Sequence, residues 1–278
     1  MGNVKPAHKA LIKKALNPPD KKSDKYSRGV LGIITGSRQY PGAGFLTVES
    51  ALKTGVGMIR FLTNDRKLKY LVLEKFPETV TTTGQVQAWL LGSGIDSKNR
   101  NFFTNRRLSK AIGQSLPQVL DAGALYLAGQ QSSPTVITPH HKELAQLLNE
   151  KSVKVSLASI QKDPSKWAKI AAQELGVIVF LKGNLSVITD GKKIEKIQAL
   201  TTQLATAGSG DVLAGILAAL LATNHQRIAQ KKISLIEISL AAGWIHQYAA
   251  LLAANDGPVS ASMLIQKIPV VIKKASSR

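Results

Sequence analysis

The sequence predicts one α/β domain built on a mainly parallel sheet that helices cover on both faces. Short runs rich in Val, Ile and Leu alternate with helical segments, and glycines follow the ends of several of these runs. Alternation of this kind is typical of a parallel sheet, because each strand needs a crossover, usually a helix, to reach the next. No internal repeat, low-complexity segment or linker interrupts the pattern. We therefore expect a domain over residues 29–278 that follows a basic N-terminal arm over residues 1–28.

The hydrophobic pattern places the elements in order along the chain. The strands are expected at 29–35, 57–63, 87–91, 118–121, 135–138 and 177–182, with a further strand after a Lys-Gly turn that reaches Ile188. Helices are expected between them at 43–53, 100–114, 142–150 and 164–175. The final third is expected to hold two well-buried helices, 211–223 and 235–254, and a short amphipathic piece at 260–267. The arm is polar and rich in Pro, Asn and Lys, which indicates a helical or irregular segment on the domain.

Composition excludes several classes of protein. The chain of 278 residues has no Cys, so disulfides, thiolate metal sites and cysteine nucleophiles are excluded. The longest strongly apolar run, Val212 to Ala222, is shorter than the roughly 20 residues that cross a bilayer. The first 28 residues lack the apolar core of a secretory signal. Five histidines without an H-E-x-x-H motif argue against a metal ligated by the protein. We expect a soluble, cytoplasmic protein.

The charge of the chain points to anionic small molecules. Lys and Arg number 37 against 17 Asp and Glu, which gives a net charge of +20. The lysines are dispersed and aromatic residues make up only 5% of the chain, so no base-stacking platform for nucleic acid is evident. A general positive field also attracts anionic metabolites. We expect no specific nucleic-acid partner.

Glycines gather where a ligand is expected. In open parallel sheets, ligands bind at the carboxyl ends of the strands, where loops enter helices. Neither a Walker A motif nor a G-x-G-x-x-G motif with its acidic partner is present. The glycines at the expected strand ends are Gly36, Gly42, Gly44, Gly92, Gly94, Gly183, Gly208 and Gly210.

The strongest local signal is the small, glycine-rich turn that leads from Ala205 through Asp211 into an apolar helix. Free backbone N–H groups at a helix N-terminus bind anions, so Gly208, Ser209 and Gly210 are expected to form an anion hole. Asp211 then stands beside that anion as a base that takes a proton from an alcohol during phosphoryl transfer. The alternative is that Asp211 only complements the helix dipole.

Two further polar residues end predicted strands. Lys182 can place its ammonium on a nucleotide phosphate, or it can be the solvated lysine of an ordinary hairpin. His140 follows Thr138-Pro139 and can form hydrogen bonds at a pocket rim. The alternative for His140 is a histidine at a helix start that the backbone satisfies.

Taken together, the motifs resemble the ADP/ATP-dependent NAD(P)H-hydrate dehydratase family, a branch of the ribokinase-like superfamily. The resemblance covers about residues 10–270. The segments that carry it, in order, are Gly36-Ser37 with Tyr40-Pro41-Gly42-Ala43, Ala51 to Gly57, Pro77-Glu78, Gly92-Ser93-Gly94, Leu120-Asp121 with Ala124-Leu125, Thr138-Pro139-His140 with Glu143, Leu181-Lys182-Gly183, and Gly208-Ser209-Gly210-Asp211.

The resemblance implies a repair reaction. The substrate of the family is the S form of NADH or NADPH that has taken up water across its nicotinamide ring. The ring hydroxyl is phosphorylated and phosphate is expelled, with ADP giving AMP in bacterial stand-alone members and ATP preferred in animal and fungal relatives. Mg²⁺ is implied as a cofactor. A homotetramer, and a separate epimerase as a functional partner, are also implied.

The resemblance assigns roles to individual residues. Contacts to the hydrated nicotinamide fall on Ala43, Gly94, His140 and Asp211. Contacts to the adenine nucleotide fall on Lys182, Gly183, Asn184, Leu185, Ser186 and Gly210.

The chain departs from the family pattern at several positions. Gly123 replaces the second carboxylate of an Asp-Ala-Asp-Ala-Leu pattern, and Ser93 replaces a proline. Other departures are His141-Lys142, Thr201-Thr202-Gln203 and Ala207. Two alternatives stay open: a ribokinase-like kinase of a vitamin precursor, which shares the Gly-x-Gly-Asp centre, and a non-catalytic nucleotide- or RNA-binding relative.

Overall fold

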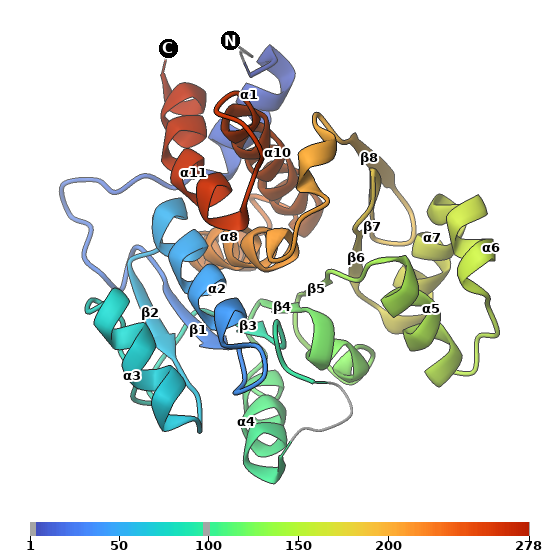
Figure 1. Cartoon of the computed structure of the whole chain (residues 1–278), viewed down its shortest axis with the longest axis horizontal. Coiled ribbons are helices and arrows are strands. Elements are labelled where there is room, and N and C mark those ends of the chain that lie inside the picture. The colour runs from blue at the N-terminus through green and yellow to red at the C-terminus, as the bar shows by residue number, and fades with distance from the viewer. Residues whose placement is uncertain (1–3, 97–100, 278) are drawn as a thin grey trace.

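An eight-stranded sheet forms the centre of the protein. The computed structural model describes residues 4–96 and 101–277 (Figure 1). The strand order is β2-β1-β3-β4-β5-β6-β7-β8; the strands from β1 to β6 pair in parallel, and β7 and β8 pair antiparallel at one edge. The bounds are β1 Val30–Ile34, β2 Met58–Phe61, β3 Ala88–Leu91, β4 Gln118–Leu120, β5 Thr135–Ile137, β6 Ile178–Leu181, β7 Leu185–Thr189 and β8 Ile194–Gln198.

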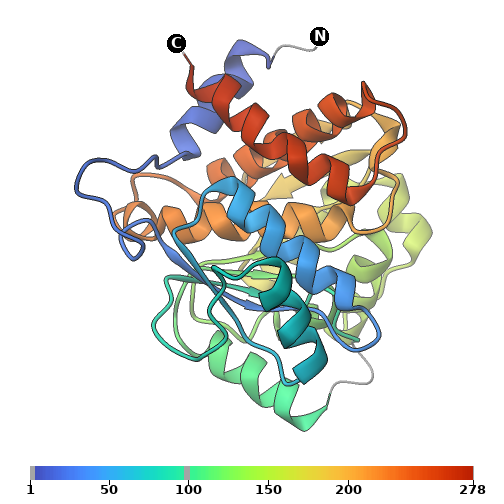
Figure 2. The ribbon, with the colours of Figure 1, turned by 60° about the vertical axis from the view of Figure 1, so that its left-hand side comes forward.

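Helices cover the sheet on both sides, which confirms the predicted α/β class (Figure 2). The bounds are α1 Pro6–Ala15, α2 Pro41–Thr54, α3 Arg66–Lys75, α4 Phe102–Ile112, α5 His141–Glu150, α6 Leu157–Lys162, α7 Pro164–Leu175, α8 Ser209–Thr223, α9 His225–Ala229, α10 Leu235–Ala254 and α11 Ala261–Ser276, with short 3₁₀ turns η1 Ala122–Leu127 and η2 Thr202–Leu204.

The two faces of the sheet build two separate hydrophobic cores. Alternate side chains of a strand point to opposite faces, so Leu31 and Ile33 join one core while Val30 and Ile34 join the other. The first core contains side chains of α2, α3, α8, α10 and α11, and the second contains side chains of α4, α5, α6 and α7. All five residues of β1 are buried, as expected for a strand covered on both faces.

The predicted elements are found with shifted ends, and several are additional. The structure adds α3, α6, α9 and β8 to the predicted set. Most of β8 is exposed, so its sequence lacks the apolar signal that marks the inner strands. The amphipathic piece predicted at 260–267 is the first half of a helix that continues through Pro269 to Ser276. The first residue of the helix predicted at 100–114 lies outside the described residues, and the described helix is α4.

The N-terminal segment lies on the helical layer formed by α10 and α11. The ring of His8 stacks on Trp244 with centroids 3.5 Å apart, and the hydroxyl of Tyr248 accepts a hydrogen bond from the backbone N–H of Lys5. The boundary between residues 28 and 29 stays a prediction. Helix α10 is long and apolar enough to cross a membrane, but most of it is buried inside the protein, which accounts for its composition.

Candidate active site

The glycine-rich turn positions the first turn of α8 at the carboxyl edge of the sheet. Gly208 precedes the helix with φ +85°, and a Cβ there would lie 2.4 Å from Leu46. Glycine is therefore required at this position by both backbone and space. A Cβ on Gly210 would meet Nζ of Lys182 at 3.4 Å, so the ammonium of Lys182 lies beside this turn. The backbone N–H of Ser209, one of the three residues of the predicted anion hole, donates to the carbonyl oxygen of Thr206 at 3.4 Å.

Lys182 is held by two carboxylates, one directly after β4 and one in the first turn of α5. Its Nζ donates to Oδ1 of Asp121 at 2.9 Å and lies 3.9 Å from Oε2 of Glu143. Burial opposes the charge of Lys182, but the two carboxylates outweigh it and raise the pKa of the ammonium. Lys182 is therefore a fixed cation. Its side chain is only 20% exposed, so the alternative of a solvated hairpin lysine is wrong.

Asp121 is a buried carboxylate, and both of its oxygens accept hydrogen bonds. Its side chain is 3% exposed. The hydroxyl of Ser93 donates to Oδ2 at 2.8 Å, and the hydroxyl of Thr138 donates to Oδ1 at 2.8 Å. Ser93, which departs from the family pattern, thus takes part in fixing Asp121 and through it Lys182. Gly123 has no room for a side chain, because a Cβ there would lie 2.2 Å from the carbonyl oxygen of Ile95.

The surroundings of Asp211 raise the pKa of its carboxyl far above the ordinary value of 3.8. Burial raises the pKa of its carboxyl to about 7, and the negative charges of Asp121 and Glu143 act in the same direction. Lys182 opposes this rise. A carboxyl with a pKa near 7 can accept a proton at neutral pH, whereas an ordinary aspartate is a much weaker base. The helix dipole cannot account for the rise, because it favours the charged form of an acid at a helix N-terminus.

His140 begins α5 and forms a capping box with Glu143. Its Nδ1 accepts from the backbone N–H of Glu143 at 3.1 Å, and its own backbone N–H donates to Oε2 of Glu143 at 2.8 Å. The backbone therefore satisfies one ring nitrogen, as the second of the two interpretations expected. The side chain is 53% exposed, so the rest of the ring is open to a ligand.

Ala43 and Gly94 lie against each other near this centre. Gly94 has φ +65°, and a Cβ on it would lie 2.3 Å from Cβ of Ala43. Ala43 comes from the first turn of α2 and Gly94 from the loop after β3. Two residues that are distant in the sequence, both predicted to contact the hydrated nicotinamide, are thus brought together by the fold.

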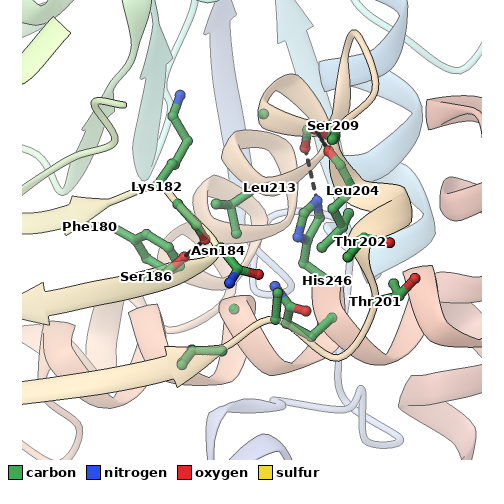
Figure 3. Close-up of a pocket in the computed structure, with 17 residues that line it drawn as sticks. Phe180, Lys182, Asn184, Ser186, Thr201, Thr202, Leu204, Ser209, Leu213 and His246 are labelled. Carbon is green, nitrogen blue, oxygen red and sulfur yellow. Dashed lines mark hydrogen bonds between the residues drawn. The ribbon is translucent and has the colours of Figure 1, made fainter. Parts of the chain in front are cut away.

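A cavity of about 450 Å³ opens beside Lys182 and Gly210, which are part of its lining (Figure 3). Of the predicted nucleotide contacts, Leu185 is absent from its lining. Asp211 is also absent. The lining residues are Phe180, Lys182, Gly183, Asn184, Ser186, Ile197, Ala199, Thr201, Thr202, Leu204, Ala205, Ser209, Gly210, Leu213, Gly243, His246 and Gln247.

The motif analysis missed the residues that α10 and the segment after β8 contribute to this cavity. His246 is the clearest case: it is 6% exposed, and its Nε2 donates to the carbonyl oxygen of Ser209 at 2.9 Å. Burial lowers the pKa of His246 to about 4. A His-Gln pair in the middle of a mostly apolar helix is the sequence signal that could have drawn attention to it. Within residues 4–96 and 101–277, no group of three or more His, Asp or Glu side chains is placed to hold a metal ion.

The fold defines a ribokinase-like α/β protein. A crystallised ADP/ATP-dependent NAD(P)H-hydrate dehydratase from Bacillus subtilis superposes with a TM-score of 0.79 at 22% identity, covering 95% of this chain and 96% of that one. A ribokinase-like superfamily protein from Enterococcus faecalis also gives 0.79 at 22% identity, with 99% of both chains covered. These likenesses confirm the predicted fold.

The sequence places the chain in a particular family of this class. The family model for NAD(P)H-hydrate dehydratase matches residues 31–273, so the chain belongs to that family. The chain is 32% identical to a bifunctional NAD(P)H-hydrate repair enzyme from Corynebacterium glutamicum, over 92% of this chain and 49% of the relative. It is 27% identical to an ADP-dependent (S)-NAD(P)H-hydrate dehydratase from Neisseria meningitidis, over 88% of this chain and 84% of the relative. The chain spans about half the length of the bifunctional relatives.

Proposed function

We propose that the protein is an ADP-dependent (S)-NAD(P)H-hydrate dehydratase, which restores NADH or NADPH from its hydrate. The observation that carries the proposal is the carboxyl of Asp211, with its pKa near 7, beside a glycine-rich helix start and a fixed ammonium. Family membership and the name of the Neisseria relative support the same activity. The vitamin-precursor kinase is less well supported, because the family model is that of the dehydratases.

The proposed reaction begins with proton transfer to Asp211. The hydroxyl of the hydrated ring loses its proton to the carboxylate, and its oxygen attacks the terminal phosphoryl group of ADP. The bond between that phosphorus and the bridging oxygen breaks, and AMP leaves. The lone pair of the ring nitrogen then expels phosphate from the ring carbon. Loss of a proton from the neighbouring carbon restores the double bond, so ADP and the hydrate give AMP, phosphate and the intact coenzyme.

The residues divide between two adjoining regions. We assign the hydrated nicotinamide to the region of Ala43, Gly94 and His140, with Asp211 at the reacting end. We assign the adenine nucleotide to the cavity lined by Lys182, Gly183, Asn184, Ser186 and Gly210, with Leu185 supporting it from outside the lining. Lys182 and the amides of the α8 start would stabilise the charge on the phosphoryl group in transfer.

We propose that Mg²⁺ enters with the nucleotide. The described residues form no acidic metal cluster, and hydrogen-bond donors already occupy both oxygens of Asp121. Phosphate oxygens and water would then supply most of its ligands, and the ion would neutralise phosphate charge. We also propose a homotetramer and functional linkage to a separate epimerase on the strength of the family resemblance, and a cytoplasmic location on the strength of the composition.

Recovery of absorbance at 340 nm tests the function. Purified protein is mixed with hydrated NADH and Mg²⁺, with ADP in one sample and ATP in another. We expect recovery with ADP and little with Asp211→Asn. Lack of recovery with both nucleotides, together with phosphorylation of a vitamin precursor, would instead identify a kinase. Salt-sensitive RNA binding without turnover would identify the non-catalytic relative.

A further inference from the structure

His246 is a buried polar group that the proposed reaction does not use. It projects from α10 into the wall of the cavity, among apolar neighbours that include Leu213 and Leu204 (Figure 3). A polar side chain that is 6% exposed needs a hydrogen-bond partner to offset the loss of water. Its Nε2 has one in the carbonyl oxygen of Ser209, 2.9 Å away.

The contact with Ser209 decides which ring nitrogen carries the hydrogen. A carbonyl oxygen can only accept, so Nε2 must be the donor. The pKa of about 4, which burial lowers from the ordinary value, keeps the ring neutral at physiological pH. The other nitrogen, Nδ1, is then an acceptor with a free lone pair. No described residue donates to it, and it lies on the side of the ring turned away from Ser209 (Figure 3).

The position of His246 along the cavity limits what can reach that acceptor. Lys182 and Gly210 lie together, since a Cβ on Gly210 would meet Nζ of Lys182 at 3.4 Å, and they make a cationic end that suits phosphate. A Cβ on Gly243 would meet the side chains of Ile197 and Phe180, so these three residues make an apolar end that suits a purine ring. His246 is joined to Ser209, in the same turn as Gly210, and therefore lies close to the phosphate end. A phosphate oxygen is itself an acceptor, so it cannot pair with Nδ1. The sugar between phosphate and base carries hydroxyl donors.

We propose that His246 is a specificity-determining residue whose Nδ1 accepts a hydrogen bond from a ribose hydroxyl of the bound nucleotide. The inference rests on the proposed use of this cavity for ADP. The bond from Nε2 to Ser209 fixes the ring, so the acceptor is already oriented before the nucleotide binds. The protein would in this way distinguish ribonucleotides from deoxyribonucleotides.

Calorimetric titration of the full chain with ADP, 2′-deoxy-ADP and 3′-deoxy-ADP in Mg²⁺ tests the proposal without the hydrate. We expect one deoxy analogue to bind about tenfold more weakly than ADP, because loss of that hydroxyl leaves a buried acceptor unpaired. Equal affinity for all three nucleotides would overturn the inference even if no variant could be purified. Inosine diphosphate provides a further arm, since it lacks the amino group of adenine. Loss of affinity only for inosine diphosphate would place the donor on the base and also overturn the inference.

Variants then show whether His246 is responsible. In His246→Leu, the discrimination between ADP and the deoxy analogue should disappear, whereas general damage to the cavity would weaken both nucleotides alike and leave their ratio unchanged. His246→Gln retains an N–H and an acceptor oxygen and should restore part of the discrimination. His225→Leu is the matched control, because His225 also bonds a backbone carbonyl but lies at the opposite end of α8. Discrimination that persists in His246→Leu contradicts the proposal.

The same titrations separate this inference from the proposed function. If ADP binds with ribose discrimination but the hydrate is not consumed, the inference stands and the proposed reaction fails. If ADP does not bind, both fail. If ADP binds and the hydrate is repaired without ribose discrimination, only the inference fails.

Discussion

Replacing Asp211 with asparagine should stabilise the protein at pH 8 while abolishing hydrate repair. The carboxyl has an ordinary pKa of 3.8, which the folded state raises to about 7. Because the folded state binds this proton more tightly than the unfolded chain, folding stability falls as the pH rises between those two values. Each pKa unit corresponds to about 1.4 kcal/mol, so the ionised carboxylate costs at most about 4 kcal/mol at pH 8. The asparagine side chain carries no charge and avoids that cost.

Thermal unfolding at several pH values measures this effect. We expect the Tm of Asp211→Asn to exceed that of the unmodified protein by roughly 4 to 10 °C at pH 8, given the usual 2–4 °C per kcal/mol for chains of this size and partial solvent screening. The difference should shrink as the pH falls toward 5, where the folded protein already holds the proton. Asp256→Asn, which changes an exposed carboxylate, is the matched control and should show neither effect. A lower Tm for Asp211→Asn at pH 8, or a difference independent of pH, would refute the reasoning.

Four further outcomes are expected. Hydrate repair should rise about tenfold between pH 6 and pH 8, because the deprotonated fraction of a base with a pKa near 7 rises by that factor. In Glu143→Gln the rise should begin at lower pH, since one of the charges that raises the pKa of Asp211 is removed, and an unchanged pH–rate profile would contradict this. Gly208→Ala should lower stability by about 1–3 kcal/mol in urea unfolding, because alanine is strained at φ +85° and meets Leu46; wild-type stability would show that the turn adapts. His8→Ala should lose about 1 kcal/mol of stability with an unchanged KM for ADP, and a changed KM would mean that the stacked ring acts on the cavity.

Local sequence patterns predicted the architecture because the order of apolar and polar residues that marks a strand or a helix lies within one continuous segment of the chain. Apolar runs such as Val30–Ile34 mark strands covered on both faces, and the glycines after them mark the edge where ligands bind in parallel sheets. The patterns did not predict β8, whose side chains are mostly exposed. The sequence of β8 is mostly polar because its side chains face water, so it did not register as a strand.

The candidate site was predicted in part. The sequence drew attention to Gly208, Gly210 and Asp211 because they lie close together in one turn. The backbone conformation of this turn requires glycine at position 208. His246 was missed because it lies 37 residues from Ser209, and only the packing of α10 against the start of α8 brings the two together. Leu185 was included in the nucleotide set because it lies within a continuous motif, although its side chain is not part of the cavity lining.

The sequence by itself determined the fold class, the family and the turn that carries Asp211. The tertiary structure decided the electrostatics of the site. Asp121 and Lys182 stand 61 residues apart, and the sheet brings their charged atoms to 2.9 Å because β4 and β6 end at the same edge. The pKa of Asp211 depends first on burial and then on these charges, and both depend on distances through space that no local pattern encodes.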